Sequence, residues 1–124
     1  MKVNALDHIV LVVADVERSL GWYIDELGLA PERVDEWRDG KAFFPSVRID
    51  ATTLIDIVPG EVGAGRGNLD HFCLVVNDDV AALADSGRFD VVEGPVQRWG
   101  ARGDATSIYV RDPDGNLVEL RRYQ

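Results

Sequence analysis

The sequence predicts an α+β fold built from two copies of one unit, each reading strand, helix and then three strands. The segment LDHIVLVV at residues 6–13 returns as LDHFCLVV at residues 69–76, an offset of 63. The same offset aligns LIDI at 54–57 with LVEL at 117–120 without a gap. Two copies of a supersecondary unit are too few for a solenoid, so we expect a pseudo-twofold pair that shares one core.

The first copy begins with a strand and continues into a helix. Residues 5–13 are β-branched and apolar on both faces, which is typical of a buried strand. Asp15 is a suitable N-cap for a helix over about 16–27, and Gly28 is a suitable C-terminal stop. Three strands are then expected, near residues 32–38, 42–49 and 52–58.

The second copy repeats this order with a shorter helix. We expect its first strand at 69–76 and its helix near 79–86. The sequence DPDG at 112–115 predicts a tight turn, because proline and glycine fix the backbone there. The last two strands therefore form a hairpin, and the expected strands lie near residues 90–98, 105–110 and 116–122.

Length and composition suit one globular domain, residues 1–124. With 46% hydrophobic residues a core can be buried. The repeats are expected at about 4–60 and 67–124, joined by a glycine-containing loop over 59–67. A net charge of -9 argues against nucleic-acid binding. The single cysteine excludes an internal disulfide, and no segment approaches the ~20 apolar residues of a membrane span, so we expect a cytoplasmic protein.

Symmetry between the copies predicts a metal site. Each copy has a histidine in its first strand, His8 or His71, and a carboxylate in its last, Asp56 or Glu119. Two histidines and one or two carboxylates that converge form a divalent-metal site with open positions for water or substrate. A hydrogen-bonded core histidine is the common alternative for either residue alone. Glu119 also lies in an apolar strand, where its charge must be solvated, paired or bound to a metal.

Asp56 is the weaker candidate because its side chain is one methylene shorter than that of Glu. It can bind the metal directly, act through a water, act as a base, or face solvent. Asp7 and Asp70 directly precede the histidines. Strand alternation therefore places them on the opposite sheet face, as capping or strand-edge residues and not as ligands.

Strand alternation also predicts the lining of a substrate pocket. Ser107 and Tyr109 are expected on the site face, with Ile108 and Val110 on the helix-facing side. Cys73 shares the face of the site histidine, and its alternative role is that of a small core residue.

A stretch at 94–104 carries two further pocket candidates, Arg98 and Trp99. Its glycines and proline predict a loop, which could act as a lid over the site. An exposed tryptophan there could equally serve a dimer interface.

The motifs LDHIVLVV, LDHFCLVV and RDPDGNLVEL resemble the strand motifs of the vicinal-oxygen-chelate superfamily, which includes glyoxalases, bleomycin-resistance proteins and dioxygenases. The resemblance covers the whole chain. Residues 94–120 are similar more narrowly to glyoxalase domain-containing protein 5 and virulence-associated glyoxalase-like proteins. The superfamily resemblance implies two βαβββ units that form a cup-shaped, partly open barrel of mixed sheet around a metal. Three metal ligands of the superfamily correspond to His8, His71 and Glu119. The fourth ligand position corresponds to Asp56, where glyoxalase I usually has Glu.

The resemblance implies a glyoxalase I-like lyase or isomerase that acts on a small-molecule substrate with vicinal oxygens, such as the adduct of a 2-oxoaldehyde with a thiol. One divalent metal (Ni, Zn, Co, Mn or Fe) would polarise both oxygens and stabilise the enediolate. A carboxylate would move the proton, with Glu119 the first candidate and Asp56 the second. The family also implies a homodimer.

Three alternatives stay open. An Fe(II) dioxygenase fits two histidines and one carboxylate, but the chain has no third histidine to act as acid or base. Thiol transfer to an antibiotic, as in fosfomycin resistance, would need cations such as Arg98, Arg102 and Arg121. A metal-free binding protein is the last alternative, although such relatives commonly lack the ligand residues that are present here.

Overall fold

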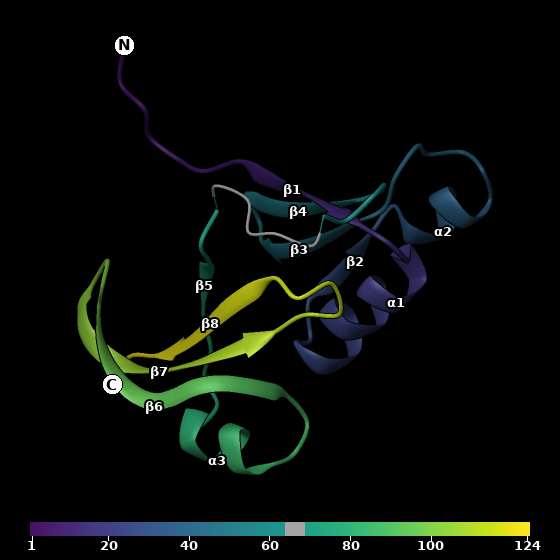
Figure 1. Ribbon diagram of the computed structural model, residues 1–124. Coiled ribbons are helices and arrows are strands. Elements are labelled where there is room, and N and C mark those ends of the chain that lie inside the picture. The colour runs from purple at the N-terminus through teal and green to yellow at the C-terminus, as the bar shows by residue number, and fades with distance from the viewer. Residues whose placement is uncertain (64–68) are drawn as a thin grey trace. The chain divides into compact units, whose positions relative to one another are not determined.

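The computed structural model describes residues 1–63 and 69–124, which form two compact units, Met1–Gly63 and Ala64–Gln124 (Figure 1). The glycine-containing loop expected over 59–67 lies partly outside the described residues. Within them, no helix is long and apolar enough to cross a membrane.

The first unit is one four-stranded mixed sheet with its helices. The strands lie in the order β1-β4-β3-β2, with β1 parallel to β4 and the other pairs antiparallel. In chain order its elements are β1 (His8–Val13), α1 (Val16–Gly21), a π-helical continuation η1 (Trp22–Glu26), β2 (Ala30–Glu32), α2 (Val34–Arg38), β3 (Ser46–Asp50) and β4 (Thr53–Pro59).

The second unit repeats that topology. Its sheet has the order β5-β8-β7-β6, again with the first strand parallel to the last. The α+β class and the two βαβββ repeats are therefore confirmed. In chain order its elements are β5 (Phe72–Val75), α3 (Val80–Asp85), β6 (Asp90–Gly100), β7 (Gly103–Arg111) and β8 (Leu117–Arg122).

Side-chain capping sets the ends of the helices. The carboxylate of Asp15 accepts a hydrogen bond from the backbone N–H of Arg18, at 3.1 Å. Gly28, with φ of +75°, ends the helical segment as expected. In the second unit, the Asp79 carboxylate accepts from the backbone N–H of Ala81 at 2.9 Å and starts α3.

Core packing decides which way the site residues point in the first unit. Helix α1 packs against β4, and Ile55 and Ile57 of β4 are fully buried. Because side chains alternate along a strand, Asp56 projects from the other face of the sheet.

The second unit follows the same rule. Helix α3 packs against β6, β7 and β8, and it lies beside β6 in Figure 1. Val118 and Leu120 pair with Val110 and Ile108, and all four are buried, as expected for the helix-facing side. Glu119 therefore projects from the opposite face.

Two sequence-based assignments were wrong. The strand expected at 32–38 stops at Glu32, and α2 follows. Arg33 turns the chain there with a left-handed backbone, φ +56°. Residues 94–104 are not a loop: β6 continues to Gly100 and pairs with β7 from Gly103 onward, so a two-residue turn joins two long strands. The lid expected at 94–104 is thus the end of a β-hairpin.

Candidate functional site

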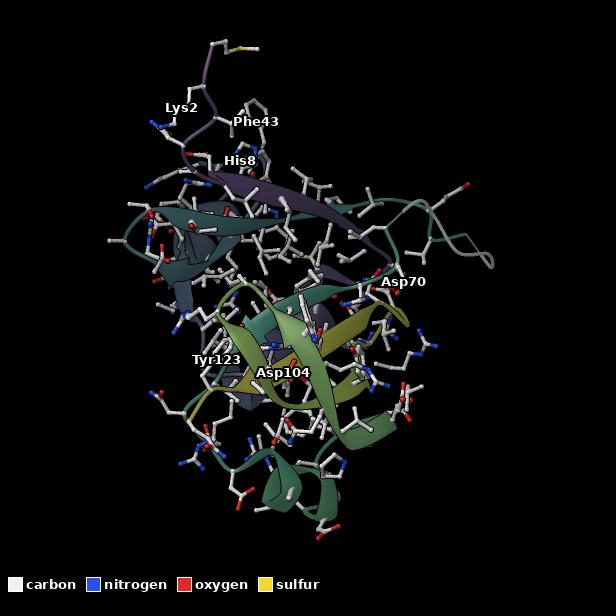
Figure 2. The ribbon with its side chains drawn as sticks, turned by 90° about the vertical axis from the view of Figure 1, so that its left-hand side faces the viewer. Lys2, His8, Phe43, Asp70, Asp104 and Tyr123 are labelled. Atoms are coloured by element: carbon white, nitrogen blue, oxygen red, sulfur yellow. The ribbon has the colours of Figure 1, made fainter. Side chains whose placement is uncertain are left out.

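In the second unit a histidine and a carboxylate face each other. His71 directly precedes β5, and Glu119 lies in β8, the strand parallel to β5. The His71 Nε2 and Glu119 Oε2 atoms are 3.2 Å apart. On the other side of the ring, Nδ1 lies 2.7 Å from the Asp70 carboxylate, which Figure 2 shows just before the strand.

The other oxygen of Glu119 is tied to the protein. Its Oε1 accepts a hydrogen bond from Ser107 Oγ at 2.5 Å and others from Arg121 Nη2 and Nε at 3.1 and 3.3 Å. Burial raises the pKa of Glu119, but these hydrogen bonds and the charges of Arg121 and His71 outweigh it, and the pKa lies below its usual value. Glu119 is therefore a buried carboxylate anion.

The first unit contains the related pair. His8 Nε2 lies 3.8 Å from Asp56 Oδ2, and His8 Nδ1 lies 2.7 Å from the Asp7 carboxylate. Asp56 Oδ1 accepts a hydrogen bond from Ser46 Oγ at 2.6 Å. Arg33 Nη2 in turn donates to Ser46 Oγ at 2.7 Å and lies 3.6 Å from Asp56 Oδ1.

Strand alternation predicted that Asp7 and Asp70 lie on the opposite sheet face from the histidines, and this prediction was wrong. Strand β1 begins at His8 and β5 begins after His71, so both aspartates are outside the strands, where alternation does not apply. Each places its carboxylate on the Nδ1 of the next residue. A carboxylate at Nδ1 fixes the ring so that Nε2 can bind a metal, as is usual for metal-binding histidines. The repeated Asp-His dipeptide was the signal for this role.

Two predicted pocket residues lie beside the His71–Glu119 pair. Ser107 is the hydrogen-bond donor to Glu119. The Tyr109 ring meets the His71 ring edge-on, with 5.4 Å between centroids. Both face the site side, as strand alternation indicated.

Cys73 pairs with Glu119 across β5 and β8 and is exposed, so the core-filling alternative is wrong. Partial burial of the thiol and the nearby Glu119 charge raise its pKa to about 11. A thiol with this pKa stays protonated near neutral pH, which argues against a nucleophilic role.

Arg98 and Trp99 lie on opposite faces of β6. Arg98 pairs with Ala105 on the site face, and its guanidinium donates to the Glu93 carboxylate. Trp99 is 87% exposed, while its backbone carbonyl accepts a hydrogen bond from Arg121 at 2.7 Å. Trp99 is therefore linked to the site through its backbone carbonyl and Arg121.

A cavity of about 360 Å³ opens beside β6, β7 and the last residues of the chain. Figure 2 labels two of its residues, Asp104 and Tyr123, close together. Neither His71 nor Glu119 lines it, although Tyr123 also contacts Arg121. The His71–Glu119 pair therefore lies outside the lining of this cavity.

The pairs can be tested for their fit to a metal ion. No group of three or more His, Cys, Asp or Glu side chains in the described ranges is placed to hold one, and each unit supplies two donors. Two ligand atoms about 2.1 Å from one ion are roughly 3.0–3.4 Å apart when they are neighbours. The 3.2 Å between His71 Nε2 and Glu119 Oε2 fits this spacing, and the 3.8 Å between His8 Nε2 and Asp56 Oδ2 exceeds it.

Replacing Asp7 with asparagine is expected to lower the pKa of His8. The hydrogen bond to Asp7 is the largest cause of its raised pKa, and asparagine carries no charge to stabilise the imidazolium. NMR titration of the imidazole C2 proton measures this, with assignment from a His8→Gln variant. Asp70→Asn is the matched control and should leave the His8 midpoint unchanged. An unchanged midpoint in Asp7→Asn would contradict the role of this carboxylate.

Two βαβββ units that each set a histidine against a carboxylate are the arrangement of the vicinal-oxygen-chelate class. The chain belongs to the Glyoxalase/Bleomycin resistance protein/Dioxygenase superfamily, whose model matches residues 5–120. The superfamily name includes enzymes, namely glyoxalases and dioxygenases, together with resistance proteins.

Three relatives illustrate the similarity. The chain is 32% identical to virulence protein STM3117 of Salmonella typhimurium strain LT2, over 99% of this chain and 87% of the relative. It is 36% identical to glyoxalase domain-containing protein RDO1 of Mycosarcoma maydis, over 100% and 71%. Among solved structures, the integron cassette protein VCH_CASS1 of V. cholerae matches with a TM-score of 0.76 and 29% identity, over 100% of this chain and 98% of that one.

Proposed function

We propose that this protein is a divalent-metal-dependent enzyme of glyoxalase type, which moves a proton between adjacent carbons of a small substrate with vicinal oxygens. A 2-oxoaldehyde adduct of a thiol is a substrate of this kind. The observation that carries the proposal is the 3.2 Å separation of His71 Nε2 and Glu119 Oε2. The other side of each group is hydrogen-bonded, His71 to Asp70 and Glu119 to Ser107.

His8, His71 and Glu119 are the proposed metal ligands. In the tautomer that we propose for metal binding, Nδ1 of each ring donates to Asp7 or Asp70, which leaves the Nε2 lone pair for a cation. When bound, a divalent cation polarises two adjacent substrate oxygens and stabilises the negative charge that develops on them. Nickel, zinc, cobalt, manganese and iron all accept this donor set.

Asp56 is the proposed proton-transfer group. Its Oδ1 is fixed by Ser46, while Oδ2 lies beyond ligand spacing from His8 Nε2. A carboxylate that is oriented but not committed to a metal can accept and return a proton. From sequence alone, Glu119 ranks first and Asp56 second for this role. We favour Asp56, because hydrogen bonds from Ser107 and Arg121 restrain Glu119.

Thiol transfer to an anionic antibiotic has less support. Such a substrate needs free cationic groups, and two of the arginines considered for this role are engaged elsewhere. Arg121 is buried against Glu119, and Arg98 is paired with Glu93.

Elemental analysis of purified wild type and His8→Ala protein tests the proposal. We expect about one metal per site in the wild type and its loss in the variant, because a three-ligand site with one ligand removed binds weakly. Asp78→Ala, at an exposed aspartate, is the control and should keep the metal. Hemithioacetal isomerisation is then assayed on the loaded protein. Wild-type protein that takes up no metal on titration would reject the proposal and leave a small-molecule binding protein.

A further inference from the structure

We infer that Arg121 is a positioning residue that commits one oxygen of Glu119 to the protein and leaves the other, Oε2, for the cation. The inference rests on the proposed function for the cation, but the restraint on Glu119 is present without one.

Hydrogen bonds from the protein occupy Oε1 of Glu119. It accepts three hydrogen bonds, from Ser107 Oγ and from Nε and Nη2 of Arg121, at distances of 2.5 to 3.3 Å. A carboxylate oxygen has two lone pairs, so Oε1 has no capacity left for an ion. Oε2 instead faces His71 Nε2.

Arg121 is itself held in place by burial and by hydrogen bonds. Its side chain is 2% exposed, although arginine is almost never fully buried unless it is paired. Nη2 donates to the Trp99 carbonyl at 2.7 Å and Nη1 donates to the Gly103 carbonyl at 3.2 Å. The Tyr123 hydroxyl lies 3.4 Å from Nη1. Backbone carbonyls at the end of the β6–β7 hairpin thus hold the guanidinium.

Gly100 leaves the space in which that guanidinium lies. A Cβ at this position would fall 1.9 Å from Arg121 Nη1 and 2.4 Å from the Tyr123 hydroxyl. Any larger residue must therefore displace the guanidinium or the hairpin end. The segment first read as a lid acts instead as the support of a site residue.

The first unit restrains its carboxylate less. Asp56 has one short hydrogen bond from Ser46, and Arg33 stays 3.6 Å away with its side chain 41% exposed. At the offset of 63 residues, Arg33 corresponds to Val96 and Arg121 corresponds to Val58. Each copy thus recruits its arginine from an unrelated position, so the pairing is not a remnant of the duplication.

This restraint has a consequence for coordination. A carboxylate that binds through both oxygens occupies two positions on an ion, whereas Glu119 held by Arg121 occupies one. The second position stays available to substrate, as a catalytic site requires. The structure thus divides the carboxylates into a fixed ligand, Glu119, and a less restrained group, Asp56.

The test compares Co(II)-loaded wild type with Gly100→Ala and Arg121→Lys by visible absorption, which reports the coordination number of the ion. We expect weaker d–d bands in both variants, because released Oε1 raises the coordination number. Arg122→Lys, at the exposed neighbouring residue, is the matched control and should keep the wild-type spectrum. Circular dichroism checks that each variant folds.

A metal-free measurement separates this inference from the proposed function. The carboxyl carbon-13 signal of Glu119 should shift in Gly100→Ala and stay in place in Arg122→Lys. An unchanged Glu119 signal in folded Gly100→Ala, or an unchanged cobalt spectrum, overturns the inference. Wild type that binds no cobalt rejects the proposed function, and the carbon-13 comparison still decides whether Arg121 restrains Glu119.

Discussion

Replacing Glu119 with glutamine is expected to lower metal affinity by more than about 100-fold, because even the loss of an outer hydrogen-bond partner commonly costs about 10–100-fold. Glutamine keeps the shape of the side chain but removes the anionic oxygen that lies 3.2 Å from His71 Nε2. The change also leaves the buried Arg121 charge without its anion. Because the amide oxygen still accepts hydrogen bonds, we expect a loss of about 1–3 kcal/mol in unfolding free energy. Isothermal titration with Co(II) and urea unfolding measure the two effects.

Asp56→Asn is the matched control, since it makes the same chemical change in the other repeat. It is expected to keep the metal and to lose hemithioacetal turnover, because the proton-transfer group is gone while the ligands remain. If Asp56→Asn lost the metal and Glu119→Gln kept it, the assigned roles would be reversed. Equal metal loss in both would make Asp56 a direct ligand.

Replacing Gly94 with alanine is expected to destabilise the protein by at least about 3 kcal/mol, the largest effect that we expect from a single methyl group. Gly94 has φ of +108°, which side chains rarely adopt. A Cβ there would lie 2.6 Å from the Ser107 carbonyl oxygen and 2.9 Å from the Ile108 Cα. These are backbone atoms of β7, so β6 and β7 must separate. Urea unfolding gives the change in unfolding free energy.

Gly87→Ala is the control for backbone conformation alone. Gly87 has φ of +75°, and a Cβ there would meet no atom within 4 Å. We expect a loss of about 1–2 kcal/mol. Similar losses at Gly94 and Gly87 would show that contact with β7 adds nothing. The clash would displace the backbone of Ser107, and the Ser107 side-chain hydroxyl donates to Glu119, so Gly94→Ala should also weaken metal binding.

The repeat made most of this fold predictable. The apolar strands have a strong pattern, and the helix caps at Asp15 and Gly28 have a chemical signature, so both were found. The region around Arg33 was missed because three residues of strand and five of helix are too short for either period to show. The hairpin end at 94–104 was wrongly predicted to be a loop because glycine and proline occur both in loops and in irregular strands, so they do not distinguish the two.

Candidate residues were predictable from two signals, the match between the two copies and the strand alternation that placed Ser107 and Tyr109 on the site face. The histidines and carboxylates share the repeat offset, so symmetry identified them. Ser46 and Arg33 have no counterpart at the repeat offset. Their hydrogen-bonded link to Asp56 depends on strand register and on the backbone turn at Arg33, and no local sequence pattern indicates either. Arg121 could have been placed, because it lies two residues after Glu119 in a strand and must share its face.

The pairing of the first strand with the last in each unit determines when a ribosome-bound chain acquires its chemistry. His8 lies opposite Leu54, and Phe72 lies opposite Val118. Each histidine is therefore synthesised early and stays without its carboxylate until the closing strand of its own repeat has emerged. A nascent chain that has released only the first repeat holds only the His8–Asp56 pair. The more tightly restrained pair, His71–Glu119, forms only after β8 has emerged, so a nascent chain that stops before β8 lacks it.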